Sequence, residues 1–105
     1  MISSDVIRGY NDTIILCLLL DGESYGYKMI KDMAPYFAMS ESTLYTILKR
    51  LESARLLTVR TAEHDGRLRK YYQITAAGRA RLAEFKNEWE GVMSIYRFVT
   101  GEEQK

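Results

Sequence analysis

The chain has 105 residues, 47% of them hydrophobic, which suits one domain and a single long appended element. It contains one histidine and one cysteine. A zinc site or a nucleophilic triad cannot be built from this set within one chain, so we expect no catalytic centre, no metal and no cofactor. The longest apolar run, residues 14–20, is too short to span a bilayer, and the first residues lack the basic region of a signal peptide. With the unpaired Cys17, this predicts a cytoplasmic protein without a membrane partner.

The formal net charge is only +1, but it is unevenly distributed along the chain. Residues 40–81 hold nine basic and four acidic residues, a net charge of +5, whereas residues 1–39 and 82–105 each have three basic and five acidic residues. A basic central segment is typical of a phosphate-binding surface, although a solvated charged face has the same composition.

The N-terminal part of the chain predicts one buried helix. Ser4 or Asp5 can cap an opening turn, and the apolar run 14–20 then forms the helix, which Asp21-Gly22 ends with the glycine at the C′ position. We expect Cys17, in the middle of this run, to be a buried structural thiol, with a redox sensor as the alternative.

A second helix follows, and a turn joins it to a third. Ser24 is expected to cap the second helix and Pro35 to end it, with an inward face of Tyr27, Ile30 and Met33 or Ala34. Residues 34–39 then form the turn, under which Tyr36 and Phe37 pack. Ser40 can cap the third helix through the amide of Ser42 or Thr43.

The third helix, within residues 41–52, separates its apolar and polar residues cleanly. Its apolar residues recur at i, i+3, i+4 and i+7, as in the buried stripe of an amphipathic helix: Leu44, Ile47, Leu48 and Leu51. The opposite face contains no carboxylate and consists of Ser42, Tyr45, Thr46, Lys49 and Ser53. Hydroxyls, a phenol and a cation on one face suit contacts with phosphates and base edges.

A β-hairpin is predicted directly after this helix. Residues 57–61 alternate between apolar and polar side chains, and a second strand ends at Ile74. The Asp65-Gly66 pair between them favours a type I′ turn, which needs two positive φ angles. The tip and returning strand carry Arg67, Arg69 and Lys70. A polar-faced helix followed by a basic hairpin indicates a winged helix-turn-helix, in which the helix enters the major groove.

The last helix is expected to begin after an N-cap at Thr75 and to span residues 76–100. Its large apolar residues step alternately by four and three from Gly78, forming a heptad seam: Leu82, Phe85, Trp89, Val92, Tyr96 and Val99. Such a seam predicts packing against the same helix of a second copy, although folding back onto its own domain is an alternative. The expected organisation is a DNA-binding domain (1–75), a dimerisation helix (76–100) and a polar tail (101–105).

Several motifs in this order resemble the PadR family of bacterial transcriptional regulators, from about Ile7 to Thr100. They are Ser24-Tyr25-Gly26-Tyr27, Thr43-Leu44-Tyr45 with Leu48, Arg50-Leu51-Glu52, and Arg69-Lys70-Tyr71-Tyr72 with Ile74-Thr75 and Gly78. The single short C-terminal helix is similar to that of the smaller subfamily. The resemblance implies an α+β winged helix-turn-helix with three helices, a two-stranded hairpin and a C-terminal dimerisation helix.

The resemblance also implies a homodimer that binds pseudo-palindromic double-stranded operator DNA, usually as a repressor. The DNA-binding residues would be Tyr25, Ser42, Thr43, Tyr45, Thr46, Lys49, Arg67, Arg69 and Lys70. Trp89 looks like the counterpart of a tryptophan that, in some drug-sensing relatives, stacks on planar aromatic ligands between the subunits. The alternative role for Trp89 is that of a packed interface residue.

One position departs from the family pattern. Arg55 stands after the third helix where the family usually has glycine, so the helix must end with a different cap or strain a left-handed residue. Two other functional classes stay open: a winged-helix protein-interaction module that no longer binds DNA, and a small-molecule-binding dimer built around Trp89.

Overall fold

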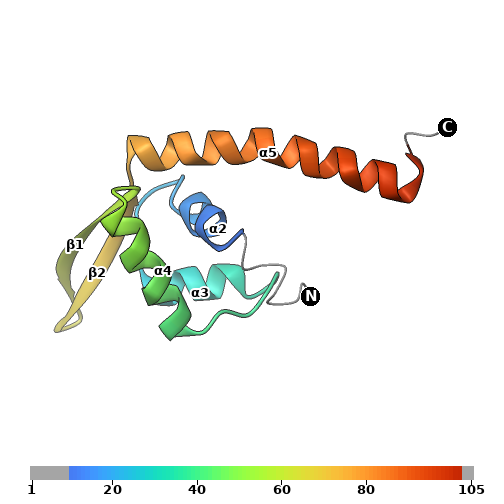
Figure 1. Ribbon diagram of the computed structural model, residues 1–105. Helices are drawn as coiled ribbons and strands as arrows, with labels where there is room; N and C mark the ends of the chain where they lie inside the picture. The colour runs from blue at the N-terminus through green and yellow to red at the C-terminus, as the bar shows by residue number, and fades with distance from the viewer. Residues whose placement is uncertain (1–9, 103–105) are drawn as a thin grey trace.

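The computed structural model describes residues 10–102. Its helices and strands are, in chain order, α2 (Asn11–Leu18), α3 (Gly26–Met33), α4 (Glu41–Ser53), β1 (Leu57–His64), β2 (Arg67–Ile74) and α5 (Ala76–Thr100). Helices α2, α3 and α4 gather beside the first half of α5, the hairpin lies at one end, and the second half of α5 projects away (Figure 1). This is the predicted winged helix-turn-helix followed by a single C-terminal helix. The expected cap at Ser4 or Asp5 lies outside the described residues.

The wing is a regular antiparallel hairpin. Strands β1 and β2 pair from Leu57 opposite Ile74 to His64 opposite Arg67. Asp65 and Gly66 have φ angles of 51° and 78°, so both turn residues are left-handed, as a type I′ turn requires. The predicted turn is confirmed.

One hydrophobic core holds the helices to the base of the wing. The predicted stripe of α4 is confirmed, because Leu44, Ile47, Leu48 and Leu51 are all buried. They pack with the other buried apolar side chains: Ile15, Leu16, Leu19, Met29, Met33, Phe37, Leu57, Tyr72, Ile74 and Leu82. The polar face of α4 is therefore directed away from the core.

Two helices begin with the predicted side-chain caps. The Ser40 hydroxyl accepts a hydrogen bond from the Thr43 amide at 3.2 Å. The Thr75 hydroxyl accepts one from the Gly78 amide at 3.1 Å and donates to the Arg55 carbonyl at 2.8 Å. Helix α5 has the expected bounds, and Pro35 follows the end of α3 as predicted.

Helix α4 ends on a strained left-handed residue. Arg55 has a φ angle of 62°; its amide bonds to the Glu52 carbonyl and the Leu56 amide to the Leu51 carbonyl, each at 2.9 Å. This pair of hydrogen bonds is the Schellman motif, in which glycine usually occupies the left-handed position. Of the two sequence-based alternatives for this helix end, strain at Arg55 is therefore the one adopted.

The predictions for α2 were partly wrong. The helix ends at Leu18 rather than at Asp21-Gly22, and Leu19 is its C-cap. Cys17 is exposed rather than buried. The buried residues of α2 are Ile15 and Leu16, its C-cap Leu19 is buried on the same side, and the 3.6-residue period turns Cys17 away from them.

The predictions for the α3 region also need correction. Ser24 does not cap the helix: Tyr25 is the N-cap, without a side-chain cap, and Ser24 instead pairs with β2. Of the predicted inward residues, Met33 is buried and Ile30 is partly buried against the core, but Tyr27 is 68% exposed. The other buried residues of α3 are Gly26 and Met29. In the following turn Phe37 is buried as expected, but the Tyr36 side chain is exposed.

Candidate nucleic-acid interface

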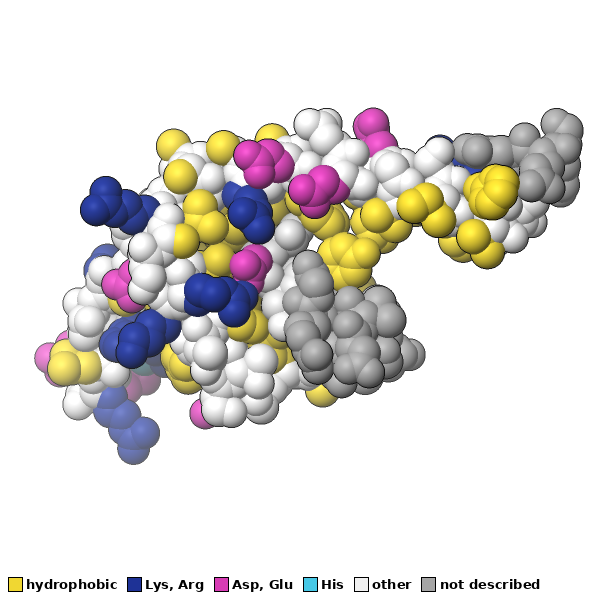
Figure 2. All heavy atoms as spheres, in the orientation of Figure 1, with side chains coloured by type: hydrophobic (Ala, Val, Ile, Leu, Met, Phe, Trp, Pro, Cys, Tyr) yellow, Lys and Arg dark blue, Asp and Glu magenta, His cyan; other side chains and the backbone are white. Residues whose placement is uncertain are grey.

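The basic side chains gather on the wing and α4 side of the molecule. Figure 2 shows Lys and Arg over this region, whereas apolar side chains follow one side of the projecting part of α5. The predicted polar residues of α4 are all exposed: Ser42, Thr43, Tyr45, Thr46 and Lys49. A basic surface beside an exposed helix face is the arrangement that the sequence predicted.

The polar side chains of α4 differ in how far they are already engaged. The Thr46 hydroxyl donates to the Ser42 carbonyl at 2.8 Å, and the Ser40 hydroxyl donates to that of Thr43 at 2.9 Å. Lys49 forms no hydrogen bond or ion pair within residues 10–102. Its ammonium group is therefore the most available cation of this face.

An open groove of about 830 Å³ is lined by residues of the wing, of the N-terminal turn of α3 and of α4. Five of the predicted site residues line it: Tyr25, Tyr45, Arg67, Arg69 and Lys70. The other four, Ser42, Thr43, Thr46 and Lys49, lie on α4 outside the groove lining. The structure thus divides the predicted set into a groove and an adjoining helix face.

Five further residues line this groove that were not among the predicted contacts: Gly26, Tyr27, His64, Asp65 and Leu68. Gly26 allows the Tyr45 side chain to approach the backbone of α3 closely. A Cβ atom at position 26 would overlap the Tyr45 hydroxyl and lie 2.9 Å from the Tyr45 Cζ atom. In the sequence, the feature that indicates this close approach is the glycine between two tyrosines in Ser24-Tyr25-Gly26-Tyr27. Leu68 is 80% exposed between two arginines, and the His64 Nε2 atom lies 3.2 Å from Asp65 Oδ2.

Arg60 and Arg69, at the middle of the wing, differ in whether a carboxylate neutralises their charge. Arg60 forms a bidentate ion pair with the carboxylate of Glu23. This hydrogen bonding lowers the pKa of Glu23 and raises that of Arg60. Arg69 has no carboxylate partner among the described residues; its guanidinium Cζ lies 3.9 Å from the ring centroid of Tyr25. The positive charge of Arg69 is therefore not neutralised by an acid.

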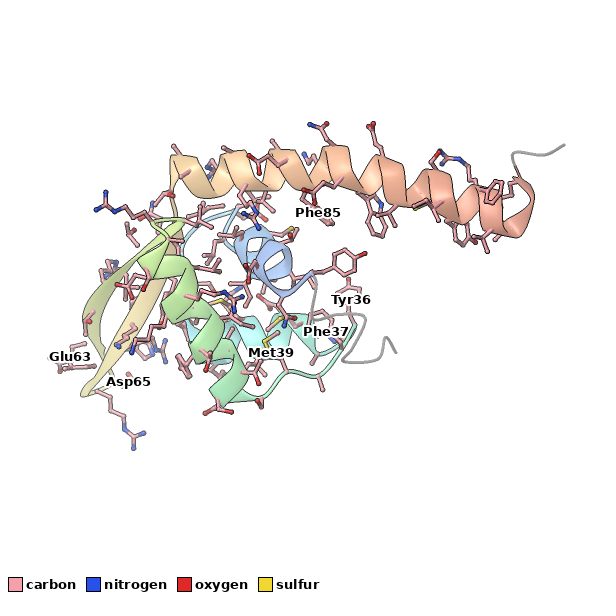
Figure 3. The ribbon with its side chains drawn as sticks, in the orientation of Figure 1. Tyr36, Phe37, Met39, Glu63, Asp65 and Phe85 are labelled. Carbon is pink, nitrogen blue, oxygen red and sulfur yellow. The ribbon has the colours of Figure 1, made fainter. Side chains whose placement is uncertain are left out.

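A second feature is an aromatic cluster between α2 and α5. The rings of Phe85 and Trp89 are stacked, with centroids 5.8 Å apart, and Tyr10 meets each of them edge-on at 5.9 Å (Figure 3 labels Phe85). Tyr10 was not singled out from the sequence. Trp89 keeps 41% of its surface exposed, whereas Leu82 is only 8% exposed within its own chain. The rest of the predicted seam, Val92, Tyr96 and Val99, is exposed.

Neither a metal site nor a membrane-spanning helix is seen in the part of the chain that the structure describes. No three His, Cys, Asp or Glu side chains in residues 10–102 come together as a metal site. No helix within the same range is both long enough and apolar enough to cross a membrane.

Comparison with known proteins identifies the family. A family model described as the transcriptional regulator PadR-like family matches residues 15–84. The chain belongs to the PadR-like family. It is therefore a transcriptional regulator, and the resemblance seen in its sequence motifs is confirmed.

Other PadR-like and regulatory proteins show the same relationship. The structure of a transcriptional regulator from Clostridium thermocellum has a TM-score of 0.82 at 39% identity, covering 92% of this chain and 96% of that one. Transcriptional regulator Rv3488 of Mycobacterium tuberculosis is 37% identical over 71 residues, 67% of this chain and 66% of that protein. Bacillus subtilis PadR, solved in complex with operator DNA, has a TM-score of 0.65 at 26% identity, covering 70% of this chain and 45% of that one.

Proposed function

We propose that this PadR-like protein is a homodimeric repressor that binds a pseudo-palindromic operator in double-stranded DNA. The observation that carries the proposal is the groove between α4 and the wing, whose lining includes Arg67, Arg69 and Lys70. Beside it lies the α4 face with Tyr45 and Lys49 exposed. Cations there neutralise phosphates, and the α4 side chains read base edges. The operator complex of Bacillus subtilis PadR supports this assignment.

The homodimer is proposed from the projecting part of α5. Exposed Val92, Tyr96 and Val99 continue the heptad seam, and Ile95 and Phe98 are 64% and 62% exposed beside it. A contiguous apolar strip on one helix is suited to burial against a second copy. A two-fold dimer presents two α4 helices, which matches a pseudo-palindromic site with half-sites about one helical turn apart.

A planar aromatic effector is proposed to act at Trp89. The indole is partly exposed and is stacked on Phe85, and its place in the heptad seam puts its free surface in the proposed dimer interface. A planar ligand that stacks there can alter the packing of the two subunits. Such a change alters the spacing of the two α4 helices and weakens operator binding.

A salt titration of DNA binding tests the proposal. The triple variant Arg67→Ala, Arg69→Ala, Lys70→Ala is compared with wild type on a duplex from the protein's own promoter, using gel shifts at several salt concentrations. We expect weaker binding and a salt slope reduced by about one unit for each phosphate that the variant no longer neutralises. A control that replaces Lys31 and Lys86, which do not line the groove, should bind as wild type does.

Two results would overturn the assignment. Unchanged affinity of the triple variant at every salt concentration would remove the wing from the interface. Salt-independent retention of a protein partner, with no DNA binding at low salt, would favour an interaction module instead. The repressor role is tested separately by transcription in vitro from the same promoter, which added protein should lower.

A further inference from the structure

Five side chains form a continuous ladder across one face of the wing. Arg60 Nε donates to Glu23 at 2.8 Å, and its Cζ atom lies 4.6 Å from the ring centroid of Tyr71. The rings of Tyr71 and Tyr25 meet edge-on, with centroids 5.9 Å apart. Arg69 then lies over the Tyr25 ring at 3.9 Å. The ladder therefore begins with the carboxylate of Glu23 and ends with the guanidinium of Arg69, and each side chain contacts the next.

The backbone explains why these side chains share one face. Ser24 pairs with Tyr72 through two hydrogen bonds: the Ser24 amide donates to the Tyr72 carbonyl at 3.1 Å, and the Tyr72 amide donates to the Ser24 carbonyl at 2.8 Å. The extended connector before α3 thus forms an antiparallel β-bridge beside β2. Because alternate residues of a strand point to opposite faces, the buried side chains of Ser24 and Tyr72 share one face, and Glu23 and Tyr25 share the other with Tyr71.

The ladder leaves Arg69 free to bind an anion. Arg60 is neutralised by Glu23, whereas Arg69 contacts the face of an uncharged ring and has no carboxylate partner in residues 10–102. Stacking uses the flat face of a guanidinium and leaves its N–H groups, which lie in its plane, available to donate. An arginine held in this way loses less conformational freedom when it binds a phosphate.

We propose that Tyr25 is a positioning residue of the DNA interface, and that its ring presets the Arg69 guanidinium for a backbone phosphate. This proposal rests on the proposed DNA-binding function. It assigns a different task to each member of the ladder. Arg69 contacts the DNA, Tyr25 orients Arg69, and Tyr71, Arg60 and Glu23 hold Tyr25 in place.

The test is a double-mutant cycle in DNA binding. Tyr25→Phe keeps the ring, and Tyr25→Leu removes it; each is measured on the promoter duplex in the wild-type and in the Arg69→Ala background. Tyr36→Leu is the control, because Tyr36 is an exposed tyrosine in the turn before α4 and does not line the groove (Figure 3). Thermal unfolding of each variant shows that the fold is kept.

We expect Tyr36→Leu to bind as wild type does, and Tyr25→Phe, which keeps the ring, to lose much less affinity than Tyr25→Leu. Tyr25→Leu should weaken binding about 2- to 5-fold, the range for an exposed cation–ring contact. The same substitution should have no further effect once Arg69 is alanine, because its effect passes through that side chain.

Three outcomes would overturn the proposal. If Tyr25→Phe is as harmful as Tyr25→Leu, the hydroxyl itself contacts DNA. If Tyr25→Leu keeps its full effect in the Arg69→Ala background, Tyr25 acts independently of Arg69. If wild type binds DNA and Tyr25→Leu binds equally well, the stacking has no role in binding. Failure of the wild-type protein to bind any duplex at low salt would instead overturn the proposed function itself.

Discussion

Gly78 packs against the main-chain carbonyl of Leu56 so closely that a Cβ atom at position 78 would overlap that oxygen and lie 2.6 Å from Cγ1 of Ile74. The carbonyl is held in place, because it also accepts a hydrogen bond from the Thr75 amide at 3.1 Å. The start of α5 therefore sits directly on the segment that joins α4 to β1. This contact orients the C-terminal helix relative to the wing.

Gly78→Ala should lower the free energy of unfolding. Alanine in a helix is normally favoured over glycine by up to about 1 kcal/mol, but overpacking typically costs about 1–3 kcal/mol, and a backbone oxygen cannot move aside easily. Gly91→Ala in the same helix is the control, since nothing lies within 4 Å of its Cβ position, and it should stabilise the protein. Urea denaturation measures both. A Gly78→Ala variant as stable as wild type would show that the start of α5 can move away from the segment joining α4 to β1 at little cost.

Arg55→Gly should raise the stability of the protein by about 0.5–1 kcal/mol, because it relieves a left-handed residue at the end of α4. Arg55→Ala separates strain from charge, since alanine keeps the unfavourable φ angle of 62°. We therefore expect a higher melting temperature for the glycine variant only. Equal gains in both variants would point to removal of the positive charge as the cause.

Gly26→Ala should displace the Tyr45 side chain without unfolding the protein. The added methyl group would overlap the Tyr45 hydroxyl, which is the far end of a flexible side chain and can rotate away. If Tyr45 contacts a base, discrimination between operator variants should change by about 1–3 kcal/mol. In a Tyr45→Ala background the Gly26→Ala substitution should have no effect on binding. An effect that persists there would place the disturbance in α3 itself.

Val92→Glu should separate the proposed dimer at micromolar concentration, because it buries an unpaired carboxylate in the seam. Asn87→Glu adds the same charge to α5 outside the seam and should leave the dimer intact. Sedimentation velocity reports both. A monomeric wild-type protein would overturn the dimer proposal, and a dimeric Val92→Glu variant would move the interface to another surface.

The proposed effector role of Trp89 requires a probe that does not depend on the tryptophan, which is the only one in the chain. Binding of a planar aromatic dye is therefore followed by the dye's own anisotropy. Trp89→Ala should abolish dye binding while the protein still dimerises and binds DNA, whereas Trp89→Phe should keep part of the dye affinity. A monomeric Trp89→Ala variant would instead identify Trp89 as an interface anchor.

Local patterns in the sequence were sufficient for most of the fold. The Asp65-Gly66 turn, the caps at Ser40 and Thr75 and the buried stripe of α4 each depend on residues only a few positions apart. A cap or a tight turn is completed by neighbouring backbone groups, and a stripe by the period of the helix itself. The basic segment, residues 40–81, was recognisable from its composition alone.

Contacts between distant segments were decided only by the tertiary structure. Ser24 has the chemistry of a helix cap, but the free edge of β2 offers its backbone two hydrogen bonds, and it pairs there instead. That pairing sets the face on which Tyr25 meets Arg69, a relationship that no local period contains. The outward turn of Cys17 likewise depends on which side of a short apolar helix the remaining core occupies. Sequence spacing determines which side chains share a face, but only packing against other elements determines what that face meets.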